Sequence, residues 1–352
     1  MKKFNIILII ALLLPIGLSA KKVYEAEKVV NHSFPASSSH TLAVENTFGS
    51  ISIELWDKNE VSADIIITGK SSRSQELAND LVGKTAVDVA VNGNTISFKT
   101  ETGSVKSSRS SNNVSQVDYV IKVPRSISFD LKNKFGNIYV DECSNQTKID
   151  IQFGNFSCVK MKSAATLRLE YGDATIQEAA QLKAKVSYST LNLSSIQALD
   201  LSSAYSKFKI GKVSTINASS SAFDDFKIEE INNLKIEAKY TPIKIDKVTG
   251  DLSIVSKFGD VVISNASSSS KSFYFNLDYG DLKININPQI GYQLDVSCKY
   301  GKLSMPEDVP INIEHREVAK NTTTIKGNIG KGTPNLKINA TSSFADIKIS
   351  AK

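Results

Sequence analysis

Phe153-Gly-Asn-Phe-Ser-Cys158 is followed, 18 residues on, by Tyr171-Gly-Asp-Ala-Thr-Ile176, which repeats its aromatic residue, tight turn and alternating side chains. From Phe135 to Phe258 the aromatic position recurs at steps of 18, 18, 17, 17, 18, 17 and 18 residues. A period this regular is typical of a stacked-repeat protein. The other copies of the aromatic position are Phe48, Tyr188, Tyr205, Phe223, Tyr240, Tyr279, Tyr300 and Phe344.

Apolar residues occupy fixed columns relative to each aromatic residue. They stand four and six residues before it and three, five and eight residues after it, with polar residues between. This alternation buries one face of each strand. An antiparallel meander with Gly-Asp hairpin turns would fit the parity. A parallel solenoid fits better, because it buries the apolar face inside its own coil and because one extra residue would flip a strand's faces. We therefore predict an all-β fold, a parallel β-solenoid (β-helix) of about 17–18 residues per coil.

The turns after the aromatic residues are expected to use Gly for a positive φ angle, which Asp or Asn also tolerates. Four middle copies lack this Gly, which leaves their turn geometry open. Ser203 and Ser221 are small residues at an inward position, in coils that carry Phe208 and Phe226. This combination indicates volume compensation within a coil.

The N-terminal segment predicts a signal peptide over residues 1–20, with Lys2 and Lys3, an apolar stretch and Ser19-Ala20 at its end. No Cys follows it, so a lipoprotein anchor is not expected. No other segment has about 18 consecutive apolar residues, so the mature chain is expected to lack a transmembrane segment. The protein is therefore expected to be exported and to be periplasmic, on the cell surface or secreted.

The remaining chain divides into three parts. Residues 21–125 are expected to hold the first coil, around Phe48, and a small mixed N-terminal cap. Within this cap we expect a short helix over 74–82, a hairpin at Asn92-Gly93-Asn94 and a flexible loop over 101–116. Residues 126–305 are expected to form the regular solenoid. Residues 306–352 are expected to contain an irregular loop, to 332, and the final C-terminal coil, over 335–349.

Several stretches resemble a known family. Asn46–Val61, Tyr119–Pro124 and Asn328–Gly332, together with the Phe/Tyr-Gly-Asp/Asn copies, are similar to the bacterial (Bacteroidota-type) "putative adhesin" family of β-strand-repeat proteins of unknown function. The resemblance covers nearly the whole mature chain. It implies a parallel β-helix in the cell envelope and says little about chemistry.

Three cysteines occur, at 143, 158 and 298. Each falls in an apolar column, so we predict buried free thiols. Cys143 and Cys158 stand in different columns, which argues against a disulfide between them. An odd number of cysteines cannot pair fully.

Catalytic patterns are absent from the sequence. The three histidines lie outside the regular repeats, and no zinc-binding, phosphate-loop or Ser-His-Asp pattern is present. The outward acids Glu170, Glu237 and Asp278 occupy scattered coils. An Asp column two after the aromatic residue is interrupted, which favours turn capping over calcium binding. We predict no enzyme activity and no cofactor; the alternatives are a carbohydrate-active enzyme on a β-helix and an envelope-stress sensor acting through a protein partner.

One outward column is basic. Lys209, Lys227 and Lys244 stand four after the aromatic residue on consecutive coils, with Lys283 and Lys348 further on. Like charges on neighbouring strands destabilise a sheet, so this column suggests a polyanion-binding stripe; a plain solvated face is the alternative. Without Lys2 and Lys3 the net charge is only +4, which does not indicate nucleic acid. The expected partner is an envelope or extracellular glycan or a surface protein.

Overall fold

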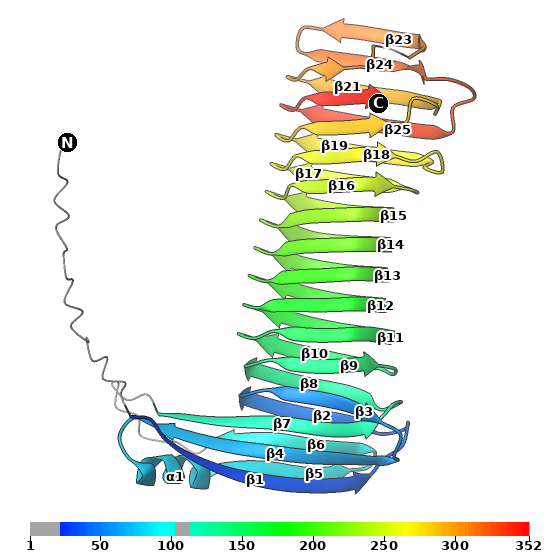
Figure 1. Ribbon diagram of the computed structural model, residues 1–352. Coiled ribbons are helices and arrows are strands. Elements are labelled where there is room, and N and C mark those ends of the chain that lie inside the picture. The colour runs from blue at the N-terminus through cyan, green and yellow to red at the C-terminus, as the bar shows by residue number, and fades with distance from the viewer. Residues whose placement is uncertain (1–21, 103–112, 308, 352) are drawn as a thin grey trace, which may run out of the picture.

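The structure is a computed structural model that describes residues 22–102, 113–307 and 309–351. The strands stack into one elongated column, with helix α1 at its base and strand β23 at the far end (Figure 1). The predicted signal peptide, residues 1–20, lies outside the described residues.

Each coil has two sides that meet at the ladder residue, which is the aromatic residue of its repeat. We call the strands that end at this residue the leading sheet and those that follow it the trailing sheet. Neighbouring coils pair in parallel on both sides: Ile149 lies opposite Leu167 in the leading sheet, and Phe156 lies opposite Ala174 in the trailing sheet. The parallel β-solenoid predicted from the period is therefore confirmed.

Five long strands bend and serve both sheets in turn. They are β11 (Phe156–Glu170), β12 (Asp173–Ser187), β13 (Thr190–Ala204), β14 (Lys207–Ala222) and β15 (Asp225–Lys239). The shorter strands of the regular coils are β8 (Ser128–Phe135), β9 (Ile138–Cys143), β10 (Thr147–Gln152), β16 (Ile243–Val248), β17 (Leu252–Lys257), β18 (Val261–Ala266), β19 (Ser272–Asp278), β20 (Leu282–Ile286), β21 (Tyr292–Lys299) and β22 (Leu303–Ser304).

The core lies between the two sheets and runs through the whole column. The predicted inward columns are buried, as Leu167, Ile176 and Ile228 show with 2% exposure or less. Burying such a side chain contributes about 1.5–3 kcal/mol relative to leaving it in water. The continuous core is therefore a main source of stability, and it fixes which face of each strand meets solvent.

The N-terminal cap adds strands to both sheets below the first coil. Strands β6 and β7 pair in parallel with β2 and β3, and β1, β4 and β5 extend the sheets in antiparallel fashion. The predicted helix and the hairpin β5–β6 are present, and the Ser74 hydroxyl caps the helix by accepting from the Leu77 N–H at 3.2 Å. The cap and first coil comprise β1 (Tyr24–Pro35), β2 (Thr41–Phe48), β3 (Ile51–Trp56), β4 (Glu60–Ser71), α1 (Gln75–Lys84), β5 (Thr85–Asn92), β6 (Thr95–Thr102) and β7 (Val114–Pro124).

The predicted bounds of the loop, residues 101–116, are wrong at both ends. Strand β6 continues to Thr102, and β7 begins at Val114, where it pairs with Lys70 of β4. Pairing with neighbouring strands outweighs the loop-like Ser and Asn composition there. Residues 103–112 lie outside the described residues.

The C-terminal part also differs from expectation. The segment expected to be irregular contains an antiparallel hairpin of β23 (Ile311–Ala319) and β24 (Thr322–Ile329), which pairs with β21. The expected final coil, β25 (Leu336–Ser343) and β26 (Ile347–Ala351), is not at the end of the stack. It lies between the coils of Tyr279 and Tyr300, because β25 pairs with both β19 and β21, and β26 with both β20 and β22. Figure 1 accordingly shows the C-terminus inside the stack, below the hairpin.

The corner geometry corrects the expected role of Gly. From Phe153 onward the ladder residue itself has the positive φ, between 51° and 59°, in every coil, including the four that lack Gly. Only Gly49 and Gly136 carry a positive φ after the aromatic residue. At Gly154 the requirement is space, since a Cβ would lie 1.9 Å from the Gly136 carbonyl oxygen of the coil below. Gly is thus needed there for close approach of backbones.

Candidate binding surface

The lysine stripe consists of Lys209, Lys227, Lys244, Lys283 and Lys348, all exposed on the outer face of the trailing sheet. Lys227 lies opposite both Lys209 and Lys244 on the neighbouring coils. Val262 then interrupts the stripe, and beyond it Lys283 lies opposite Lys348. The last contact follows from the intercalated C-terminal coil, so spacing in the sequence could not show it.

A shallow groove of about 590 Å³ lies along the first three of these lysines. Glu229 and Asp246 line the same groove. In the described part of the chain no carboxylate lies within ion-pair distance of any of the five lysines. Their ammonium groups therefore remain available to a ligand, although two carboxylates lie close by.

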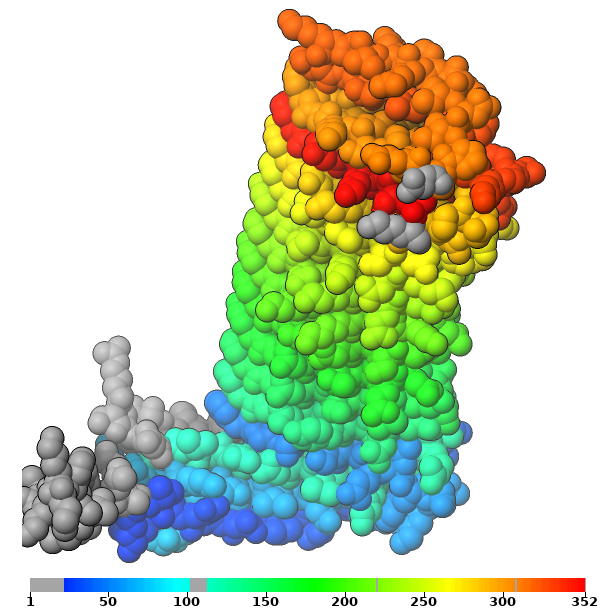
Figure 2. Space-filling model, turned by 45° about the horizontal axis from the view of Figure 1, so that its top comes forward, coloured from blue at the N-terminus to red at the C-terminus, as the bar shows by residue number. Residues whose placement is uncertain are grey.

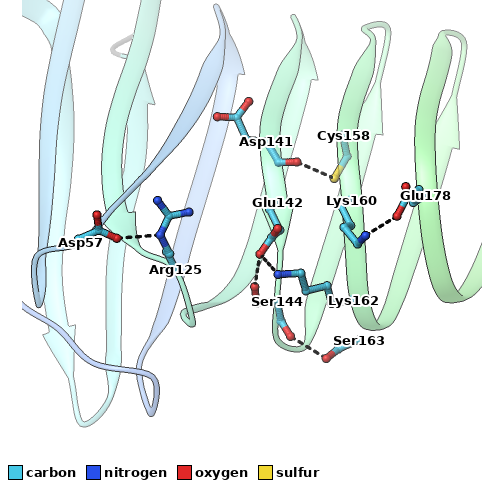
Figure 3. A network of polar contacts seen from close by, with 10 residues as sticks. All are labelled: Asp57, Arg125, Asp141, Glu142, Ser144, Cys158, Lys160, Lys162, Ser163 and Glu178. Atoms are coloured by element: carbon cyan, nitrogen blue, oxygen red, sulfur yellow. Dashed lines mark hydrogen bonds and ion pairs between the residues drawn. The ribbon is translucent and has the colours of Figure 1, made fainter.

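Charges on the lower coils of the same sheet are arranged differently. Lys160 pairs with Glu178 on the next coil, and Lys162 pairs with Glu142 at 2.5 Å (Figure 3). The hydrogen bond from Lys162 lowers the pKa of Glu142 below its usual range. These side chains satisfy one another, as Lys247 and Glu230 do at 3.4 Å on the upper coils. The stripe is therefore distinguished by its lysines, for which no such partner occurs among the described residues.

The Asp column beside the stripe has a structural role. The Asp281 N–H donates to Asp260 Oδ1 at 2.9 Å, the Asp346 N–H donates to Asp281 Oδ1 at 3.0 Å, and the Lys302 N–H donates to Asp346 Oδ1 at 2.8 Å. Each carboxylate thus caps a backbone N–H of the adjacent coil rather than of its own turn. No group of three or more metal-ligating side chains occurs among the described residues.

The ladder residues form a continuous stack along one edge of the column. From Phe48 to Tyr300, successive ring centroids lie 4.7–5.1 Å apart with nearly parallel planes. Each ladder residue from Phe153 onward is about half exposed, at 44–51%. Each ring covers the face of the next, so the ladder offers ring edges to solvent. A sugar stacks on a ring face, and the ladder is therefore a corner stack.

The family model Toastrack DUF4097 matches residues 48–350, which include every ladder residue. The chain belongs to this family. No functionally curated protein matches the sequence.

Several solved structures resemble the Toastrack chain at low identity. A putative cell adhesion protein from Clostridium sporogenes is 14% identical and has a TM-score of 0.22, with 94% of this chain and 100% of that chain covered. A putative adhesin from Bacteroides fragilis is 14% identical, with a TM-score of 0.36 and coverage of 73% and 96%. One from Parabacteroides distasonis is 10% identical, with a TM-score of 0.37 and coverage of 73% and 97%. The register of the coils, and not these likenesses, establishes the details of the fold given above.

The outward acids named from the sequence do not converge in the Toastrack column. Glu170 pairs with Arg168 at 2.9 Å, and Asp278 pairs with Lys257 at 3.3 Å. Glu237 lies on a coil between theirs. These three carboxylates therefore do not form the facing pair that glycoside hydrolysis requires. In the described part of the chain, no helix is long and apolar enough to span a bilayer.

A second shallow hollow, of about 880 Å³, lies on the leading sheet. Basic and acidic side chains are mixed around it, and Arg168 pairs with Asp150 at 3.4 Å. The charged residues that line it are Asp130, Lys132, Lys148, Asp150, Arg168, Lys183, Lys185 and Asp200. Acidic side chains thus stand among the basic ones here, although Arg168 lies opposite Lys185 on the next coil.

A buried carboxylate went unnoticed in the sequence. Asp224 replaces the corner Gly, is 4% exposed and accepts from the hydroxyls of Ser203 and Ser221 at 2.8 and 2.7 Å. It also accepts from the Ser206 N–H at 2.7 Å. Burial raises the pKa of Asp224. Ser203 and Ser221, which were expected to compensate for volume, are hydrogen-bond donors to this carboxylate. The sequence signal that could have revealed the buried carboxylate is a charged residue at the position where Gly normally follows the aromatic residue.

The three cysteines are buried free thiols, as the sequence predicted. Cys143 and Cys158 nevertheless meet, with their Sγ atoms 3.8 Å apart. The two residues lie on neighbouring coils, Cys143 in β9 and Cys158 in β11. This distance is far longer than the roughly 2.05 Å of a disulfide, and the contact is a thiol–thiol hydrogen bond.

We expect the thiols to stay reduced in the native protein. Exposures of 1% for Cys143 and 2% for Cys158 keep oxidants away from both thiols. Maleimide labelling in denaturant without reductant, followed by mass spectrometry, should therefore count three labels, against none on the folded protein. A species with one label would show a native disulfide and contradict this expectation.

Proposed function

We propose that this protein is an exported, non-enzymatic β-solenoid of the cell envelope that binds an extended acidic polymer along the lysine stripe. The observation that carries the proposal is the row of exposed lysines, three of them on consecutive coils, for which no ion-pair partner occurs among the described residues. Export rests on the signal-peptide pattern of residues 1–20 and the envelope on the adhesin-like resemblance of the sequence.

The spacing of the coils favours a linear ligand. Neighbouring parallel strands lie about 4.8 Å apart, so the lysines form a straight array that runs along the column axis. A single exposed ion pair contributes about 0–1 kcal/mol, so useful affinity needs several contacts made by one chain. Glu229 and Asp246 in the groove oppose binding of an anion and make simultaneous engagement of the lysines necessary.

Replacing Lys209, Lys227 and Lys244 together by Gln tests the proposal. We expect affinity for alginate, a linear polyuronate, to fall at least about tenfold, since three contacts of about 0.5–1 kcal/mol each are lost. The melting temperature should hardly change, because all three side chains are exposed. Isothermal titration at low and high salt measures the loss, and binding by the unmodified protein should weaken as salt shortens the screening length from about 10 Å at 0.1 M to about 3 Å at 1 M.

Two matched variants serve as controls. Replacing Glu229 by Gln and Asp246 by Asn should strengthen alginate binding, because the groove loses two repelling charges. Replacing Lys183 and Lys185 by Gln, on the leading sheet, should leave binding unchanged. Equal binding by the triple variant and the unmodified protein would show that the stripe is only a solvated face. A pull-down of native envelope material with both proteins extends the test to the natural polymer.

A further inference from the structure

The two sheets end at different heights at the C-terminal end of the column. The trailing sheet stops at β22, which has two residues, whereas the leading sheet continues through β24 to β23. In Figure 2 the orange residues of this hairpin form the projecting end of the molecule. Among the described residues, no trailing strand therefore lies opposite the inner face of β23.

Strand β23 is exposed along its whole length. All nine residues from Ile311 to Ala319 are exposed, including Ile311 and Ile313 at 41% and Val318 at 66%. Among the described strands β23 pairs only with β24, so its other edge carries backbone N–H and C=O groups free to pair with another strand. At the opposite end of the column, helix α1 packs against β1 and β4. The C-terminal end has no such cover among the described residues.

The bulge in β23 decides which of its residues share the inner face. Ile313 lies opposite Gly327, and after a register shift Arg316 lies opposite Ile325. Residues directly opposite in an antiparallel pair point to the same face. Gly327 and Ile325 face inward with Leu294 and Val296 of β21. The inner face of β23 therefore carries Ile311, Ile313, Arg316 and Val318.

We propose that β23 is a self-complementary edge at which a second copy of this chain docks. The two β23 strands run antiparallel across a two-fold axis and continue the leading sheet from one column into the other. One register keeps inner residues opposite inner residues and places no like charges directly opposite each other. It pairs Ile311 with Val318 of the second copy, Ile313 with Arg316, Asn312 with Glu317 and Glu314 with His315.

The two neighbouring registers are excluded, because one places like charges opposite each other and the other pairs an inward residue with an outward one. A shift of one residue in one direction sets Glu314 opposite Glu314 of the second copy. A shift in the other direction sets inward Ile313 opposite outward Glu317. Register is strongly specified when a slip exchanges the two faces, so the bulge selects one pairing. Because the interface is two-fold symmetric, each pair of different residues occurs twice, which doubles the effect of any single substitution.

Sedimentation equilibrium of the mature chain tests this pairing. We expect a reversible dimer. Ile313→Lys sets Lys opposite Arg316 of the second copy twice and should raise the dimer dissociation constant at least about tenfold. Ile313→Glu, equally polar, sets Glu opposite Arg316 and should preserve the dimer. The double variant Ile313→Lys with Arg316→Glu restores opposite charges and should recover it.

Unchanged circular dichroism and melting temperature would establish that the variants are folded, because residue 313 is exposed. A monomer at all concentrations would overturn the proposal, and capture of an added extended peptide by that monomer would assign the edge to a foreign strand. Equal weakening by Ile313→Lys and Ile313→Glu, or no recovery in the double variant, would also overturn it, because the dimer would then lack the pairing of residues 313 and 316.

Discussion

Gly154→Val is expected to destabilise the solenoid by about 3 kcal/mol or more, because a side chain at this corner overlaps the neighbouring coil. A Cβ at residue 154 would lie 1.9 Å from the Gly136 carbonyl oxygen and 2.7 Å from its carbon. Backbone cannot move aside as the end of a flexible side chain can, so the two coils must separate locally. Urea unfolding followed by circular dichroism measures the loss as a lower midpoint at an unchanged slope.

Gly83→Ala is the matched control for this substitution. Gly83 lies in α1, and a Cβ there would meet no atom within 4 Å. Ala should therefore stabilise the protein by about 0.5–1 kcal/mol, because Gly loses more backbone entropy than Ala in a helix. If Gly154→Val matched the stability of the unmodified protein, the close approach of coils at this corner would be contradicted.

Asp224→Ala should cost about 2 kcal/mol or more. The substitution leaves the hydroxyls of Ser203 and Ser221 and the Ser206 N–H without their acceptor in a buried site, and an orphaned buried group typically costs about 1–3 kcal/mol. Asp224→Asn should cost much less. Its Oδ1 can still accept from the Ser206 N–H, and the two hydroxyls can turn to accept from its amide.

The stability of the unmodified protein should also carry a pH dependence from Asp224. Burial raises the folded-state pKa of this carboxyl above its unfolded value of about 3.9. The folded state then binds more protons than the unfolded state, so the contribution is present below the unfolded pKa and is lost as pH rises through the folded pKa. The stability of Asp224→Asn relative to the unmodified protein should therefore increase with pH from about 4 upward. A flat difference across that range would contradict a raised pKa.

The periodic part of the fold was predictable because each coil repeats the same pattern of an aromatic corner residue and inward apolar residues. The aromatic residue, the inward columns and a constant repeat length specify the register, and the pairs Lys209–Lys227 and Lys227–Lys244 followed from it. Periodicity also favoured a solenoid over a meander, because a solenoid buries the apolar face of each strand inside its own coil.

The order of the coils was not predictable in the same way. The coil of Phe344 satisfies the column rules from six residues before to five residues after the aromatic residue wherever it stands in the stack. Its pattern therefore does not reveal that it lies beside the coil of Tyr279. The adjacency of Lys283 and Lys348 depends on this order. The hairpin β23–β24 was missed because β23 is exposed along its whole length and much of β24 is polar, which gives weak alternation.

The positive φ angle at the corner was assigned to the wrong residue for a different reason. Bulky residues rarely adopt a positive φ, so propensity assigned that angle to Gly. Stacking of each ring on the next stabilises the aromatic residue in this conformation in coil after coil, with about 0.5–1.5 kcal/mol available per pair beyond area burial. Asp224 was overlooked because a lone Asp in a turn is ordinary in sequence; only packing shows that it points inward.

The stacking order of the coils is the most direct test of the account, because the full lysine stripe exists only if the C-terminal coil is intercalated. Pyrene labels can be attached to cysteine pairs in a background in which the three native cysteines are replaced by Ala. The pair Lys283→Cys with Lys348→Cys joins adjacent coils, whereas Lys283→Cys with Ser304→Cys skips one. Strong excimer emission from the first pair and weak emission from the second is the expected result. The reverse, strong emission only from 283 with 304, would mean that the coils stack in chain order and would contradict the account.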